Sequence, residues 1–249
     1  MCYLMLRLQA ALQSWGGVAT DKYRPTVDFP TMSALIGILE ALLGIKRGSL
    51  QPFLRIEFAA RKDKLWGRKP SILSDFHTIG GTLDPGGAVR KNKVIGYREY
   101  LQDTSFTVAI RVLDNSPIDF ETLKKALENP TVAVSLGRRS CWPSRPIFEG
   151  VVEANSLQDA LTKSPFHRFG DILQVRLTDS KNLKEEALKR NLYSIEGLVA
   201  SCEPLAEDTG YDMTRDVPQG TRLRRRFGLR KVYYYMMEDP TPESIAMEE

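Results

Sequence analysis

The chain has 249 residues, of which 42% are hydrophobic and 27% are charged, and its formal net charge is +4. This is the composition of an ordinary globular protein and excludes a disordered or collagen-like chain, and the length suits one large domain or a domain with a subdomain. Basic and acidic residues are segregated along the chain, which favours a polyanion-binding face over a generally basic surface.

The first sixty residues predict two strands with a helix between them. Residues 3–9 alternate as YLMLRLQ and predict a strand, which a glycine-containing loop at 13–17 follows. Residues 53–61 alternate again and predict a second strand. Between them, Thr31 can cap a helix that ends near Gly44. The helix has an apolar stripe at helical spacing, formed by Met32, Leu35, Ile36, Leu39, Leu42 and Leu43.

Residues 105–136 complete a recognisable order of elements. Residues 105–113 (SFTVAIRVL) predict a third strand, residues 118–127 predict a helix with Asp119 as its cap, and residues 132–136 predict a fourth strand. The order is β-α-β-β-α-β. It predicts an α+β fold with a ferredoxin-like, RRM-like core, which we place in residues 1–148.

A long insertion, residues 62–104, separates the second predicted strand from the third. It contains two glycine pairs and a basic stretch from Arg90 to Arg98 without an acid. An insertion of this length in a compact domain is usually functional or disordered. Beyond residue 148 the signals weaken. Residues 172–177 and 231–236 predict strands and 183–192 a short helix, so we expect a β-rich C-terminal subdomain over 149–249.

The cysteines indicate the compartment. Cys2, Cys141 and Cys202 are far apart and form no C-x-x-C pair, so we expect reduced thiols in a cytoplasmic protein and no zinc site. We expect no signal peptide, because the first residues already form an alternating strand pattern that contains Arg7, and the apolar stretch 34–45 is too short to cross a bilayer. We expect no metal, no cofactor and no membrane partner.

The stretch 134–147, VSLGRRSCWPSRPI, carries the strongest signal for a ligand. It holds Arg138, Arg139 and Arg145 and no acid, directly after a predicted strand. Guanidinium groups offer planar donor forks to phosphate oxygens, and Ser140 adds a further donor. Trp142 can stack on a base or pack beneath the strand end, and we expect packing.

Two weaker features have competing interpretations. The N–H groups of the helix start at Thr31 and Ser33 can hold a phosphate, although plain capping is the commoner use of threonine there. Gly16 and Gly17 permit close backbone approach to a ligand.

Residues for acid–base catalysis are few. His77 is the centre of the one set worth naming, and we expect it to be a packing or hydrogen-bonding histidine rather than a catalytic one. The other members of that set are Lys91, Lys93, Tyr97 and Tyr100.

Five stretches, taken in order, resemble one protein family. They are QSWGG, RPTVDFPTMSALIGILEALLGI, DFHTIGG, YREYLQDTSFTVA and LGRRSCWPSRPIF, and they run from about Tyr3 to Phe148. Together they resemble the CRISPR-associated protein 5 family in its subtype I-E form. The ending RRRFGLRKVYYY is similar to the family's terminal strand, with more arginine than expected.

The resemblance implies a non-catalytic, RNA-binding subunit of the antiviral surveillance complex called Cascade. The core would be a palm and the insertion a thumb, which together clasp the 5′ handle of the CRISPR RNA (crRNA). Its partners would be that handle, the backbone subunit and the large subunit, with target DNA reached indirectly. We expect the RNA-binding residues to be Gln13, Trp15, Gly16, Arg24, Thr31, Ser33, His77, Arg90, Lys91, Lys93, Tyr97, Arg98, Arg138, Arg139, Ser140 and Arg145.

Two alternatives stay open. In the related subtype I-C systems the corresponding subunit itself cuts precursor RNA without a metal ion. A purely structural wedge between other subunits is the second alternative. Clasping of phosphates predicts a steep dependence of affinity on salt, which a protein wedge does not.

Overall fold

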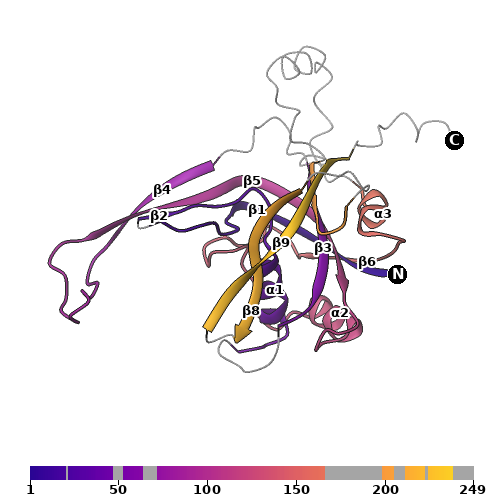
Figure 1. The fold of residues 1–249 in the computed structure, drawn as a ribbon, viewed down its shortest axis with the longest axis horizontal. Coiled ribbons are helices and arrows are strands. Elements are labelled where there is room, and N and C mark those ends of the chain that lie inside the picture. Colours follow the sequence, from indigo (N-terminus) through magenta and orange to yellow (C-terminus); the bar gives the residue numbers. More distant parts are fainter. Residues whose placement is uncertain are drawn as a thin grey trace, which may run out of the picture.

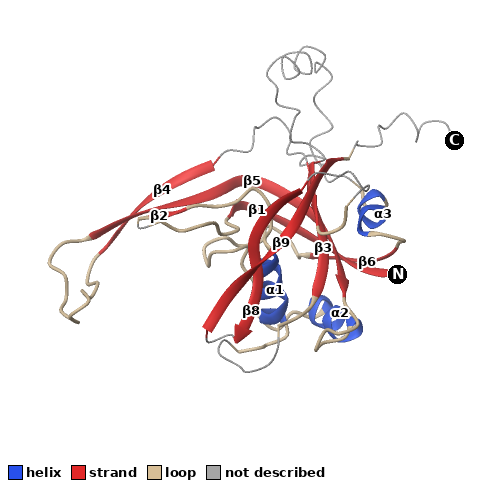
Figure 2. Cartoon of the chain, in the orientation of Figure 1, coloured by secondary structure: helices blue, strands red, loops and turns tan. Residues whose placement is uncertain are grey.

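A computed structural model describes residues 1–20, 22–46, 53–63, 72–165, 198–204, 211–221 and 224–237. Within these ranges the chain forms a nine-stranded, mostly antiparallel sheet with three helices (Figure 1, Figure 2). The α+β class expected from the sequence is confirmed. The predicted elements at 172–177 and 183–192 lie outside the described residues. No described helix has the length and apolar composition that a membrane span requires.

The strands follow the order β6-β1-β5-β3-β7-β9-β8, and the short β2 and the strand β4 both pair with β5. The strands are β1 (Cys2–Gln13), β2 (Tyr23–Arg24), β3 (Ile56–Asp63), β4 (Ile72–Ile79), β5 (Val94–Val112), β6 (Phe148–Glu153), β7 (Leu198–Ser201), β8 (Tyr211–Thr221) and β9 (Arg224–Met236). The helices are α1 (Met32–Leu42), α2 (Phe120–Glu128) and α3 (Leu157–Thr162).

Both predicted helices form, and local signals explain why. Thr31 caps α1 by accepting a hydrogen bond from the backbone N–H of Ala34, and Asp119 caps α2 by accepting one from Thr122. Gly44 follows α1 with φ +68°, which only glycine adopts without strain. The apolar faces of both helices pack on one side of the sheet. The largest core cluster lies there, and includes Leu4, Leu6, Leu8, Leu35, Leu39, Val108, Ile110 and Leu123.

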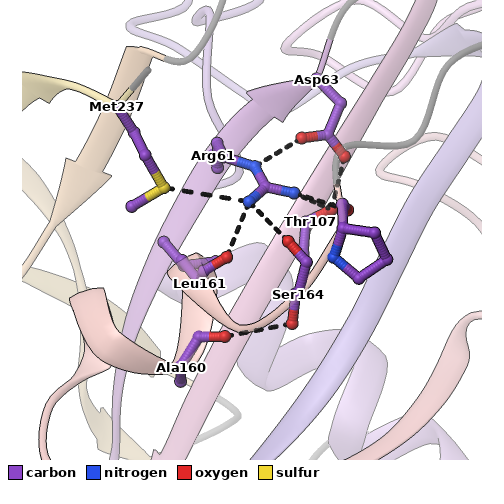
Figure 3. A network of polar contacts seen from close by, with 8 residues as sticks. Arg61, Asp63, Thr107, Ala160, Leu161, Ser164 and Met237 are labelled. Carbon is purple, nitrogen blue, oxygen red and sulfur yellow. Dashed lines mark hydrogen bonds and ion pairs between the residues drawn. The ribbon is translucent and has the colours of Figure 1, made fainter. Parts of the chain in front are cut away.

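The other side of the sheet is covered by α3. Alanines on the central strands leave room for the helix, whose Leu157 and Leu161 are fully buried against them. Beside α3, the buried guanidinium of Arg61 contacts Asp63 at 2.7 Å and donates to the carbonyls of Leu161 and Ser164 (Figure 3). An arginine can satisfy several acceptors at once because its fork carries five donors. This network therefore fixes the end of α3 to β3.

The expectation of an irregular insertion over residues 62–104 is wrong in part, because the range contains the strand β4 and the first half of β5. β4 and the first half of β5 form a long hairpin that extends away from the sheet (Figure 1). We call residues 72–101 the arm. β5 then continues without interruption into the core as the partner of β1 and β3. Asp103, at φ +46°, lies where β5 passes from the arm into the core.

The predicted fourth strand at 132–136 is also wrong. Leu136 uses its backbone groups in a local turn and in a bond to Ser14, and β6 takes the place beside β1 instead. The strand predicted at 231–236 is confirmed as the end of β9. The boundary expected between 148 and 149 falls at the start of β6, and the described strands on both sides belong to one sheet. The division into two domains stays a prediction.

Candidate nucleic-acid interface

The arginine-rich stretch forms a loop at the end of β1. Leu136 and Cys141 are buried, and the N–H of Leu136 donates to the carbonyl of Cys141 at 2.7 Å. Gly137 has φ +100°, and a Cβ there would lie 1.6 Å from the carbonyl oxygen of Ser14. Only glycine permits this approach. The loop is therefore pressed against β1, and residues 138–146 extend from that contact.

Arg138 joins this loop to the arm. Its guanidinium donates to the carbonyl of Glu99 at 2.7 Å and to the carbonyl of Arg24 at 2.6 Å. The same group lies 4.6 Å from the centre of the Tyr100 ring. The sequence suggested three guanidiniums without partners, but Arg138 is engaged by three residues of β2 and β5. Its positive charge remains close to the base of the arm.

The other two arginines differ from each other. Arg145 forms an ion pair with Glu149 at 3.0 Å, and the buried Arg7 lies 3.6 Å from the same carboxylate. Burial lowers the pKa of Arg7 to about 10, so Arg7 remains a cation at neutral pH. Arg139 and Ser140 are exposed. A ligand can therefore reach both side chains, as it can the exposed Ser144 of the same loop.

Trp142 does not pack as we expected. Its side chain is 57% exposed, because the turn at 136–141 buries Cys141 and turns the following residue outward. An exposed indole next to two arginines can stack on a base.

The tip of the arm carries a cluster of cations. A shallow hollow of about 420 Å³ is lined by Lys22, Arg90, Lys91, Asn92, Lys93, Val94 and Ile95, so four of its seven residues are basic and none is acidic. The turn that precedes it is built by Asp84, whose side chain accepts hydrogen bonds from the N–H groups of Gly86 and Ala88 at 2.9 Å. The hollow presents a strongly positive local surface.

The strand register divides the arm into two faces. Tyr97 is opposite Phe76 and beside Tyr23, and its ring stacks on that of Tyr23 with centroids 4.9 Å apart. Phe76 meets Tyr97 edge to face at 5.6 Å. The opposite face carries Arg24, His77 and Arg98. The arm therefore has one aromatic face and one polar face.

The two tyrosines of the set considered for catalysis are not placed beside the His77 side chain. His77 Nε2 lies 2.6 Å from the carboxylate of Asp75. Tyr97 lies on the other face of the arm, and Tyr100 is buried four residues along β5 from the residue opposite His77, roughly 13 Å away. This arrangement does not pair His77 with either tyrosine. Among the described residues, no three potential metal ligands are close enough to share an ion.

Two residues expected to bind RNA lie inside the protein. Gln13 and Trp15 are 0% and 1% exposed, and Trp15 packs edge to face on Phe106. β1 extends through Gln13 rather than ending before it, so the structure offers neither side chain to a ligand. Gly16, at φ +83°, is exposed beside them.

The start of α1 is already capped. Thr31 accepts from the N–H of Ala34 and donates to the carbonyl of Trp15, and its hydroxyl is 3.4 Å from that of Ser33. The N–H of Met32 donates to the carboxylate of Asp216 at 2.7 Å. The structure therefore favours the capping interpretation over phosphate binding here.

Three residues on the surface of the arm were not among the predicted RNA-binding residues: Lys22, Tyr23 and Phe76. Lys22 and Tyr23 precede Arg24 in a segment without regular periodicity, and only the pairing of β2 with β5 brings them to the arm. Phe76 lies within ILSDFHTI, where isoleucine, phenylalanine and threonine are residues of high strand propensity, and this composition was the available signal for a strand.

Comparison with known proteins places the chain among its relatives. The family model described as CRISPR-associated protein (Cas_Cas5) matches residues 3–233. The chain is 35% identical over 223 residues to the CRISPR system Cascade subunit CasD of Escherichia coli (strain K12), which covers 86% of this chain and 99% of that protein.

Two solved structures have a similar fold. A chain from a CRISPR RNA-guided surveillance complex superposes with a TM-score of 0.66 at 25% identity, covering 96% of this chain and 91% of that one. A crystal structure of a Cas protein superposes with a TM-score of 0.61 at 25% identity, covering 95% of each chain.

Proposed function

Because the chain belongs to the CRISPR-associated protein (Cas_Cas5) family, we propose that it is a non-catalytic subunit of an RNA-guided surveillance complex and binds the 5′ handle of the crRNA. The observation that carries this proposal is the 35% identity to a Cascade subunit over 99% of its length. In this function the chain works in the cytoplasm, where it contacts the backbone and large subunits and reaches target DNA only through the complex.

The fold supports a division into palm and thumb. Strands β1, β3, β5 and β6 with helices α1 and α2 follow one another in the order β-α-β-β-α-β, and their spatial order is β6-β1-β5-β3. Both orders support the proposal of a ferredoxin-like core. In this interpretation the core is the palm and the arm is the thumb. β6 supplies the fourth strand that the sequence suggested at 132–136.

The charges indicate where the handle would lie. Arg139 and Ser140 are exposed at one end of the arm, and the cationic hollow is at its other end. Between them run the polar face with Arg24 and Arg98 and the aromatic face with Tyr97. Phosphates position a bound strand and aromatic rings can stack on its unpaired bases. The arm thus combines both kinds of contact.

Handle binding can be tested by fluorescence anisotropy with the labelled repeat-derived handle RNA at several salt concentrations. Lys91→Gln with Lys93→Gln is expected to flatten the slope of log affinity against log salt by about 0.7 for each phosphate that the variant no longer neutralises. The matched control is Lys124→Gln on α2, which pairs with Glu121 and Glu128 and lies outside the arm. An unchanged slope in the arm variant would favour a structural wedge.

Nuclease activity is tested separately by incubating the purified chain with repeat RNA in the presence of a chelator. The RNA is expected to stay intact, because the strand register places neither Tyr97 nor Tyr100 beside the side chain of His77. Specific cleavage that disappears in His77→Ala would contradict the non-catalytic assignment.

A further inference from the structure

The hairpin of β8 and β9 has an outer face that the proposed handle site does not use. Alternate residues of β9 point to opposite sides: Val232 joins the core under α1, whereas Tyr235 joins the core under α3. The alternation along β9 places its odd-numbered residues from Phe227 to Tyr235 on the side away from α1, and the register places Tyr211, Met213 and Arg215 of β8 on the same side. We call this surface the hairpin face.

The hairpin face combines exposed aromatic and aliphatic side chains with cations. Tyr211, Phe227 and Leu229 are 50%, 40% and 55% exposed, and Arg215 and Lys231 are exposed between them. Tyr211 meets Tyr233 edge to face at 5.8 Å, and the ammonium of Lys231 lies 4.3 Å from the centre of the Tyr211 ring. Residues on one face of a strand are about 7 Å apart, so several bases can be accommodated along the hairpin.

The charge on this face has one sign. The described carboxylates of the hairpin, Asp212 and Asp216, lie on its other side, where Asp216 pairs with Arg230 at 2.7 Å. On the neighbouring strands, Glu57 and Glu203 are held by Arg111. A polyanion approaching the hairpin face therefore meets Lys231 and Arg215 without an opposing carboxylate on the described part of that face.

We propose that the hairpin face is a second binding surface for a single strand of RNA, separate from the handle site. Aromatic rings interleaved with basic residues bind single-stranded nucleic acids by stacking on bases and neutralising phosphates. Aromatic side chains and arginine are also common at the centres of protein–protein interfaces, but lysine is depleted there, so Lys231 in the middle of the face favours RNA over a protein partner. The bound RNA would be a further segment of the guide RNA. This identification of the RNA rests on the proposed function.

The test measures binding of a short labelled oligouridine to the full chain. Tyr211→Thr is expected to weaken binding at least about fivefold, since loss of one base stack has effects of that size, and Tyr211→Phe is expected to bind as the parent does because the ring remains. Lys231→Gln is expected to reduce the salt slope by about 0.7. A duplex of matching sequence is expected to bind more weakly, because its bases are already stacked.

Photocrosslinking keeps the test independent of any change in folding. Oligouridine carrying 4-thiouridine is expected to crosslink the unmodified chain within residues 211–233. Parent-like binding by Tyr211→Thr and Lys231→Gln, with no crosslink in that range, would overturn the proposal. So would variants that keep oligouridine binding but no longer co-purify with the other subunits, since that result assigns the face to a protein.

The two proposals fail in different ways. Arg139→Ala is expected to weaken handle binding and leave the crosslinks at 211–233 unchanged. Absence of the handle effect alone would contradict the proposed function, and absence of the hairpin crosslinks alone would contradict this inference.

Discussion

The guanidinium of Arg138 lies 4.6 Å from the centre of the Tyr100 ring, although the two residues are on different elements of the chain. Two further hydrogen bonds from Arg138, to carbonyls of β2 and β5, complete the contact. This side chain therefore ties the loop at 137–146 to the base of the arm, and we expect it to position the candidate site.

Arg138 and its neighbour are expected to behave differently when replaced. Arg138→Ala leaves two carbonyls without their donor and should lower the free energy of unfolding by about 1–3 kcal/mol. Arg139→Ala should leave stability within about 0.5 kcal/mol and instead flatten the salt slope of handle binding by about 0.7. Denaturant unfolding and anisotropy measure the two effects. Equal stability losses in both variants would contradict the different roles.

The contact between β8 and α1 is a second point where one change should matter. Asp216 is buried, accepts from the N–H of Met32 and pairs with Arg230. Asp216→Ala leaves the largely buried Arg230 without its carboxylate and should cost about 3 kcal/mol in the free energy of unfolding. Asp212→Ala, an exposed acid on the same strand, is the matched control and should cost under about 0.5 kcal/mol. Equal losses would contradict the docking role of Asp216.

The network around Arg61 should control the local stability of α3. Arg61→Lys retains the charge but not the planar fork, so it cannot satisfy Asp63 together with the carbonyls of Leu161 and Ser164. Hydrogen exchange in residues 157–165 is expected to accelerate in this variant. Exchange in α2 should change less, because that helix packs on the other side of the sheet. Unchanged exchange in α3 would show that Arg61 does not hold the helix.

Cysteine reactivity gives a prediction that depends on pH. Burial raises the pKa of the Cys202 thiol to about 12, so at pH 8 only about one thiol in ten thousand would be the reactive thiolate. Cys141 is buried and its pKa is also raised, whereas Cys2 is exposed. Iodoacetamide at pH 8 should therefore modify Cys2 first in the folded chain, and all three residues in denaturant. Labelling of Cys202 as fast as Cys2, read by mass spectrometry, would contradict the raised pKa of the partly buried Cys202 thiol.

Sequence reasoning succeeded where the signal was local. The two longer helices carry their caps, Thr31 and Asp119, and their apolar stripes in adjacent residues, so both could be predicted. Which of the segments 132–136 and 148–153 forms the strand beside β1 could not be predicted. The answer depends on which segment pairs with the free edge of β1 in the folded protein. Both segments have short apolar patterns of similar strength.

The candidate site shows the same limit. The residue types of the loop indicated a polyanion, but Arg138 is engaged by Glu99 and Arg24, which are 39 and 114 residues away in the sequence. The stacking of Tyr23 on Tyr97 likewise depends on the pairing of β2 with β5. Contacts of this range are set by the fold and leave no periodic pattern in the sequence.

The most direct test of the central claim is a nuclease-protection map of guide RNA that co-purifies with this chain and its neighbouring subunits. We predict that the 5′ handle is protected in the parent complex and becomes sensitive when Lys91 and Lys93 are changed to glutamine, while the rest of the guide stays protected. A handle that is digested as fast in the parent complex as in free RNA would contradict the account.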